Sequence, residues 1–267
     1  MVKQNTLKTM VGILLAIVFH LSLVAQSNDE YPRLEKYRKW SVNFGPTLYK
    51  KAEIAPQYGE YSFTNKPIPS FTAGIEYDFY PERKWSVITG LLVAREPVYN
   101  ISYTIFNKDL YPGSEGDLLN KAKAYSLMTF SAPLMLRLNI QSTSKTYLSF
   151  LTGLKVMYFP KGSASFAQLI SYDDNSESLE IFGLNLHSQE FSFYGSSVIG
   201  TGFSIAMDKI LLKTNLTYVI NFQNTIEGEY QFGNLFESEP TRGSYELSGN
   251  YLSLSFSVSL KKHTKVE

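Results

Sequence analysis

Five charged side chains are the first residues of this chain that could carry chemistry. Glu76, Asp78, Arg137, Lys155 and Lys213 each stand in a stretch where apolar and small polar residues alternate. If these stretches are strands, all five side chains fall on the polar faces. Acids and bases that meet in a narrow interior either neutralise one another or form a pathway for protons or ions. We expect neutralisation, because an unpaired buried charge is costly.

A histidine with a hydroxyl and a carboxylate close by is the second candidate. His187 directly precedes Ser188, and Glu190 follows, while His263 stands near the C-terminus. Such groups could transfer or hydrolyse an acyl group if the base reached its nucleophile. Adjacent residues of a strand point to opposite faces, however. We therefore predict no catalytic residue, with acyl chemistry as the alternative.

The composition leaves little room for other kinds of site. The 267 residues include no cysteine, which excludes disulfides, thiolate metal sites and a thiol nucleophile. A formal net charge of +1 gives no reason to expect a nucleic-acid partner. The acidic stretches around Asp173 and Glu227 lack the spacing of a calcium loop. We predict no metal and no cofactor.

Period-two alternation shows which elements hold the charged side chains. In Tyr251–Leu260 (YLSLSFSVSL), large apolar residues alternate with four serines, a separation that a helix would scramble. Each such stretch has the length of the roughly 9–11 tilted residues that cross an outer membrane. The pattern predicts eight strands, over residues 39–49, 69–80, 84–95, 125–139, 146–159, 191–206, 210–222 and 251–260.

Short turns alternate with long polar connections along the chain. The turns are predicted at 80–83, 140–145 and 207–209, and the long loops at 50–68, 96–124, 160–190 and 223–246. Outer-membrane barrels are built in this way, with the short turns in the periplasm. The predicted fold is therefore all-β, an eight-stranded antiparallel up-and-down transmembrane β-barrel with both chain ends in the periplasm.

The residue types on the polar faces favour a membrane barrel over a soluble, ligand-carrying barrel. These faces hold mostly Ser, Thr, Gly and Asn, whereas a soluble exterior usually holds Lys, Glu, Asp and Arg. The small residues then line an interior that eight strands just fill, so we predict no open pore. Glu76, Asp78, Arg137 and Lys213 lie near periplasmic strand ends and are predicted to meet there as a buried ionic cluster.

Aromatic residues near the strand ends match the girdles at the two surfaces of a membrane. Rings of this kind anchor barrels at the level of the lipid head groups. The residues predicted for this role are Trp40, Phe79, Trp85, Tyr147, Tyr158, Phe159, Phe193, Tyr218 and Phe222.

The N-terminus has the features of an export signal. Lys3 and Lys8 accompany an apolar run from Met10 to Val24, and Ala25 supplies a small residue for cleavage. The run is shorter than the ~20 apolar residues of a membrane-spanning helix. The sequence thus predicts export to a bacterial outer membrane. The predicted parts are a signal peptide (1–25), cut after Ala25, a periplasmic segment (26–38), the barrel (39–260) and a charged tail (261–267).

Three of the predicted strands resemble the outer-membrane β-barrel domain family of Bacteroidetes, the PorT-like group. They are an apolar-Pro-Leu strand (YSLMTFSAPLMLRLNI), a strand with a central glycine (YLSFLTGLKVMYF) and a Gly-x-Gly strand before a tight turn (SSVIGTGFSIAM). The resemblance covers roughly Trp40 to Leu260 and implies the barrel fold without an activity. PorT-like relatives suggest an accessory of type IX secretion. This chain departs from many outer-membrane barrels because its last strand ends at Leu260 and not at an aromatic residue.

The function predicted from these observations is a non-enzymatic one. We expect a structural or accessory barrel that contacts outer-membrane lipids and a periplasmic or membrane protein partner. The alternative is a barrel enzyme that modifies lipid A as an acyl hydrolase or transferase. A soluble ligand-carrying barrel is the third hypothesis.

Overall fold

The computed structural model describes residues 32–110, 116–171, 178–188 and 192–262. Several residues named above lie outside these ranges. They are the predicted signal peptide with its cut after Ala25, the start of the periplasmic segment, Asp173, Glu190 and most of the tail with His263.

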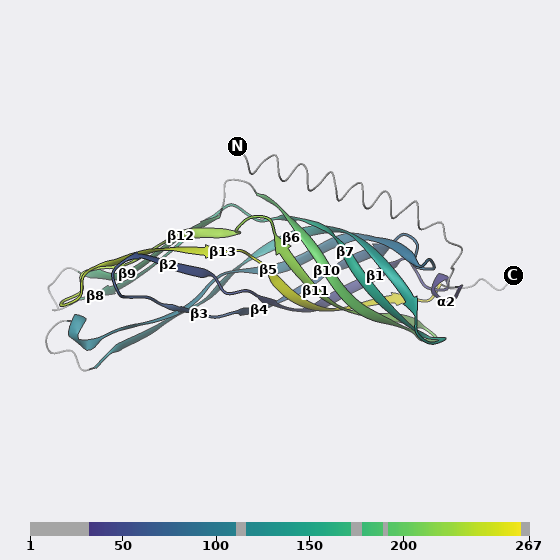
Figure 1. The fold of residues 1–267 in the computed structure, drawn as a ribbon, viewed down its shortest axis with the longest axis horizontal. Coiled ribbons are helices and arrows are strands. Elements are labelled where there is room, and N and C mark those ends of the chain that lie inside the picture. The colour runs from purple at the N-terminus through teal and green to yellow at the C-terminus, as the bar shows by residue number, and fades with distance from the viewer. Residues whose placement is uncertain (1–31, 111–115, 172–177, 189–191, 263–267) are drawn as a thin grey trace.

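Eight antiparallel strands close into a barrel (Figure 1). The last of them returns to the first, where Val42 lies opposite Val258, so the barrel has no free strand edge. This confirms the predicted fold class. Around the barrel the strands are β1 (Trp40–Tyr49), β4 (Ile68–Asp78), β5 (Trp85–Ile105), β6 (Leu118–Gln141), β7 (Thr146–Tyr158), β10 (Phe193–Ala206), β11 (Ile210–Asn221) and β14 (Tyr251–Leu260).

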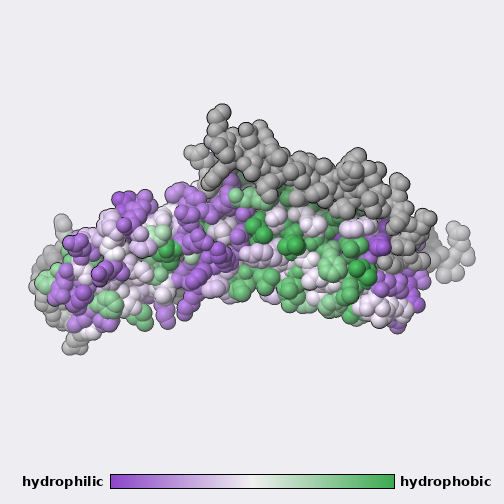
Figure 2. Space-filling model, in the orientation of Figure 1, coloured by the Kyte–Doolittle hydropathy of each residue, from purple (hydrophilic) through white to green (hydrophobic). Residues whose placement is uncertain are grey.

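The apolar faces of the barrel strands point outward. On β14, Leu252 and Leu260 are exposed, whereas Ser257 and Ser259 on the other face are buried in the lumen. Leu91 of β5 is 73% exposed. Figure 2 shows the result as a hydrophobic belt over the barrel, with a more hydrophilic surface beyond it. An apolar surface of this extent on a closed barrel is the surface that lipid covers.

The long connections fold, contrary to the prediction of polar loops. They contain β2 (Glu53–Tyr58), β3 (Thr64–Asn65), β8 (Ser163–Ile170), β9 (Leu179–Ser188), β12 (Ile226–Phe232) and β13 (Thr241–Leu247). Strands β2, β13, β12, β9 and β8 form a five-stranded sheet. The ends of β5 and β6 that extend past the barrel, with β3, form a second sheet that continues the barrel wall. We call these two sheets together the sandwich (Figure 1).

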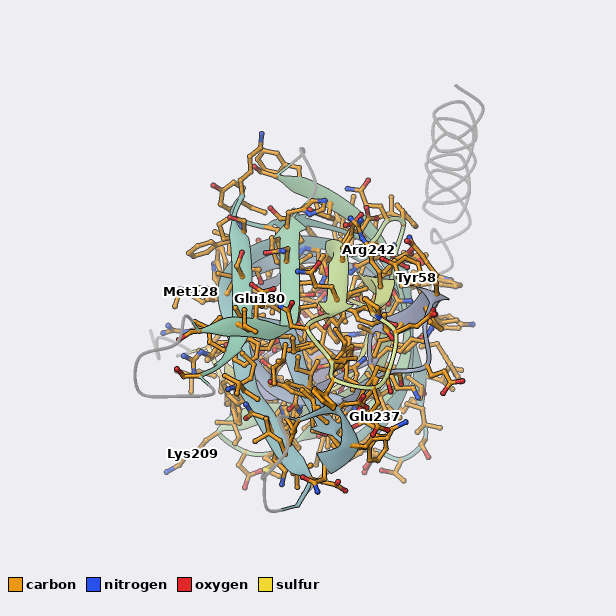
Figure 3. The ribbon with its side chains drawn as sticks, turned by 90° about the vertical axis from the view of Figure 1, so that its left-hand side faces the viewer. Tyr58, Met128, Glu180, Lys209, Glu237 and Arg242 are labelled. Atoms are coloured by element: carbon orange, nitrogen blue, oxygen red, sulfur yellow. The ribbon has the colours of Figure 1, made fainter. Side chains whose placement is uncertain are left out.

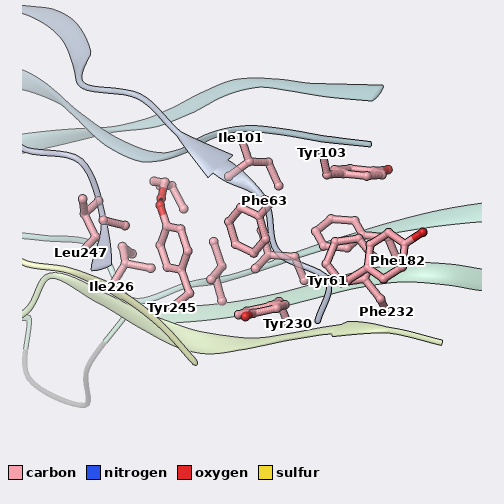
Figure 4. Close-up of a cluster of buried hydrophobic side chains, with 14 of the residues drawn as sticks. Tyr61, Phe63, Ile101, Tyr103, Phe182, Ile226, Tyr230, Phe232, Tyr245 and Leu247 are labelled. Atoms are coloured by element: carbon pink, nitrogen blue, oxygen red, sulfur yellow. Dashed lines mark hydrogen bonds between the residues drawn. The ribbon is translucent and has the colours of Figure 1, made fainter. Parts of the chain in front are cut away.

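Aromatic side chains fill the space between the two sheets of the sandwich (Figure 4). The Phe182 ring lies 4.2 Å from Tyr103, 4.8 Å from Phe232 and 5.8 Å from Phe63, measured between ring centroids. These rings come from both sheets and from the segment before β3. Burial of such large rings is what holds the connections in place as strands.

Two short helical segments complete the described chain. Helix α2 (Pro32–Glu35) lies at the short-turn end of the barrel, and the 3-10 helix η1 (Asn107–Asp109) lies in the connection between β5 and β6. No helix among the described residues has the length and apolar character to cross a membrane.

Candidate functional site: the lumen and the sandwich tip

Three of the predicted lumenal charges meet in the half of the barrel nearer the short turns, which we call the lower half. The Asp78 Oδ2 atom accepts hydrogen bonds from Arg137 Nη1 at 2.8 Å and from Lys213 Nζ at 3.0 Å. All three side chains are buried. They come from β4, β6 and β11, none of which pair with one another. The two ion pairs therefore cross the lumen and tie together strands that the sheet alone does not join.

Glu76 joins this group through a hydroxyl and not through an ion pair. Its carboxylate accepts a hydrogen bond from Ser257 at 3.0 Å, and the Ser257 hydroxyl accepts one from the Asn43 amide at 2.9 Å. We call Glu76, Asp78, Arg137 and Lys213 the lower cluster. With two acids and two bases it carries no net charge, which lowers the cost of burying each member.

Lys155 lies apart from the lower cluster, in a second polar layer nearer the sandwich. Its Nζ atom donates to the Tyr251 hydroxyl at 2.9 Å and lies 4.6 Å from the centre of that ring. Beside it, the Tyr49 hydroxyl donates to Glu96 Oε2 at 2.9 Å, and the two tyrosine rings are 4.8 Å apart. We call these four residues the upper layer.

Sequence reasoning missed three members of the upper layer. Glu96 was assigned to a loop, although the alternation of β5 continues past Arg95 and turns Glu96 inward. Tyr49 and Tyr251 share their strand faces with small polar lumenal residues, such as Thr47 and Ser253. An aromatic residue at the end of a small polar face was the signal that could have placed them in the lumen.

Little space remains in the lumen. A cavity of about 50 Å³ lies between the lower cluster and the upper layer, with Asn43, Thr72 and Asn215 in its lining. About 10–15 Å³ of such space holds one water molecule, so the cavity has room for a few. At the short-turn end, Leu34 and Tyr37 pack against Tyr147 and close the barrel.

Most of the predicted girdle aromatics lie on the outside of the barrel, but two do not. Tyr147 is 1% exposed and Phe159 is 0% exposed, so the prediction for these two residues was wrong. Leu148 and Tyr158 of the same strand point outward, which turns their odd-numbered neighbours inward. The others, Trp40, Phe79, Tyr158, Phe193, Tyr218 and Phe222, are exposed, and Trp85 is partly exposed.

His187 and Ser188 are not brought together for acyl chemistry. His187 pairs across the sheet with Glu227 and Ser163 and is exposed. The Ser188 hydroxyl instead accepts a hydrogen bond from the Gly162 backbone at 3.0 Å. Within the described ranges, no group of three or more His, Asp and Glu side chains could hold a metal ion.

Asp109 fastens the tip of the sandwich, the end farthest from the barrel. Its buried carboxylate accepts hydrogen bonds from the Tyr61 hydroxyl at 2.5 Å, the Ser238 backbone N–H at 2.6 Å and the Ser238 hydroxyl at 2.9 Å. The Glu237 N–H donates to it as well, at 3.2 Å (Figure 3 views this end, with Glu237 labelled). The carboxylate thus ties the β12–β13 connection to η1.

Acid is expected to break the hydrogen bonds that the Asp109 carboxylate accepts. Burial alone would raise the pKa of the Asp109 carboxyl, but the hydrogen bonds from Tyr61, Ser238 and Glu237 bring that pKa below its usual value. The stabilisation is therefore complete above the unfolded pKa of about 3.9 and is lost as the pH falls through the lower, folded value. Protection of the Glu237 and Ser238 amides from hydrogen exchange should fall at that pH.

Asp109→Asn should show low protection of these amides already at neutral pH, and no acid transition. Glu239→Gln, in the same connection, is the matched control and should behave as the wild type. Equal protection in wild type and Asp109→Asn would show that the carboxylate does not hold the tip.

No family model matches the chain, and no curated protein matches it either. The resemblance to the PorT-like group therefore stays a prediction. Among solved structures, the chain is similar to the outer membrane protein OprG from Pseudomonas aeruginosa, with 11% identity, a TM-score of 0.41, and 85% of this chain and 98% of that chain covered. It is also similar to Ail, the attachment invasion locus protein of Yersinia pestis, with 10% identity, a TM-score of 0.29, and 82% and 97% covered. The strand pairing described above defines the fold as a closed transmembrane β-barrel.

Proposed function

We propose that the protein is a structural or accessory barrel of a bacterial outer membrane, which conducts no solute and holds a rigid sandwich outside the membrane for contact with a partner. The observation that carries this proposal is the filled lumen. The lower cluster and the upper layer each cross it, and the cavity between them measures about 50 Å³.

The apolar belt and the short turns support an outer-membrane location. The belt covers a closed barrel. Closed barrels and α-helices are the two kinds of structure that span lipid. The short connections, the described N-terminal residues and β14's end share one side, which is the periplasmic side in barrels of this kind. The predicted signal peptide agrees with export.

The sandwich tip supports a role in protein contact. Phe106 is 51% exposed and Phe236 is 61% exposed, on the two connections that Asp109 ties together. The Phe236 N–H itself donates to the Asp109 carbonyl at 3.1 Å. Large apolar side chains that are exposed on a fixed backbone favour partner binding, because little ordering of that backbone remains to oppose association. An accessory role in a secretion or envelope complex, without catalysis, fits these features.

The purified protein should conduct nothing when it is placed in lipid. We expect liposomes that contain it to swell in an isotonic arabinose solution no faster than empty liposomes, because both polar layers block the lumen. A general porin at the same protein-to-lipid ratio is the positive control. Swelling at a rate near that of the porin would contradict the sealed lumen and with it the proposed function.

A further inference from the structure

Arg95 is the charged residue at the outer end of the apolar belt on β5. Leu91, on the same outward face, is the most exposed large apolar residue of the strand, and Arg95 is exposed two outward positions later. Arg95 pairs across the sheet with Met128 of β6, which is also exposed on the belt. The next residue, Glu96, turns inward to Tyr49. The guanidinium therefore lies at the edge of the lipid-facing surface, away from the acid beside it.

A groove of about 330 Å³ opens next to Arg95 on this outer surface. The groove opens where the pairing of β4 with β5 ends, beyond Thr72 and Ala94, and Pro69 and Pro97 in its lining have no N–H to extend that pairing. The register between β5 and β6 also shifts between Pro97 and Tyr99, which bends β5 at this level. The groove is lined mainly by Ile68, Pro69, Phe71, Arg95, Pro97 and Ser126.

Among the described residues, no carboxylate forms an ion pair with the Arg95 guanidinium. A cation at the edge of hydrocarbon is stabilised when an anion lies beside it, and phosphate matches the donor fork of arginine. Phe71 and Met128 lie beside Arg95 and are exposed, so they continue the apolar belt that lipid chains cover. The groove thus joins one anion-binding side chain to an acyl-binding surface.

We propose that this groove binds one phosphorylated lipid of the outer leaflet, lipid A, with a phosphate on the Arg95 guanidinium and an acyl chain along Phe71 and Met128. The site rests on the outer-membrane location proposed above. It is independent of the sealed lumen and of the partner at the tip.

Lipid retention by the purified protein tests this site. The protein is delipidated in mild detergent and mixed with bisphosphorylated lipid A or with dephosphorylated lipid A, and native mass spectrometry counts the lipids that remain bound. We expect one bisphosphorylated molecule on the wild type and roughly tenfold weaker retention on Arg95→Gln, which loses charge-assisted hydrogen bonds. Arg95→Lys should be intermediate, because it keeps the charge without the fork.

Arg242→Gln is the matched control, since Arg242 is exposed on the other sheet and pairs with Glu229 there. Retention by that variant should equal the wild type. Equal retention by Arg95→Gln would overturn the proposal and leave Arg95 as a simple interfacial anchor. So would equal binding of the dephosphorylated lipid to the wild type, a comparison that stands even if a variant fails to fold. Displacement of lipid A by millimolar inorganic phosphate would mark a site for free anions and overturn it too. Membrane fractionation tests the location separately.

Discussion

Phe182→Ala is expected to open the sandwich and leave the barrel intact. The Phe182 ring is fully buried and contacts rings from both sheets, so its removal should cost about 3–5 kcal/mol. The barrel has a separate buried cluster that includes Ile88, Met135 and Leu151. Local opening of the sandwich should therefore be independent of barrel unfolding. In lipid vesicles, protease should cut the sandwich of the variant at least about a hundredfold faster than that of the wild type.

Phe236→Ala is the control for this experiment, because Phe236 is exposed and its removal leaves no cavity. It should not change the rate of cleavage. The barrel is followed in the same samples by its heat-dependent shift on gels. If Phe182→Ala resisted protease as the wild type does, the aromatic core would not be what holds the sandwich. If the gel shift were lost as well, sandwich and barrel would form one cooperative unit.

The barrel could be predicted from the sequence because its exterior is lipid. Most outward positions of a membrane strand are apolar, so period-two alternation is clear in strands such as Tyr251–Leu260. The same parity placed Asp78, Arg137 and Lys213 in one lumen. It could not give the partners of each charge, because these depend on contacts across the barrel between strands that do not pair.

The sandwich could not be predicted by the same pattern. Its outward faces meet water, and its apolar residues stand singly among polar ones, as Tyr230 and Phe232 do in β12 (IEGEYQF). Each such strand is short and half polar, so its alternation resembles that of a surface loop. The aromatic core appears only when both sheets are placed together, which is tertiary information. Asp109 escaped notice for the same reason, since its partners Tyr61 and Ser238 are far apart in the chain.

Asp78→Ala is expected to destabilise the barrel itself by about 3–5 kcal/mol. Without the carboxylate, both ion pairs are lost, and the Arg137 guanidinium and the Lys213 ammonium stay buried. Urea unfolding in lipid vesicles measures the free energy of unfolding. Asp208→Ala, at the exposed turn between β10 and β11, is the matched control and should change it by less than about 0.5 kcal/mol.

A second variant separates the charge balance of the lower cluster from its individual contacts. In Asp78→Asn with Lys213→Met, Glu76 and Arg137 remain, so the cluster is again neutral. We expect this double variant to be more stable than Asp78→Asn alone, because the loss in the single variant comes mainly from uncompensated positive charge. If the double variant were instead less stable than either single variant, specific bonds and not neutrality would govern the cluster. A lumen built on neutrality tolerates changes in pairs.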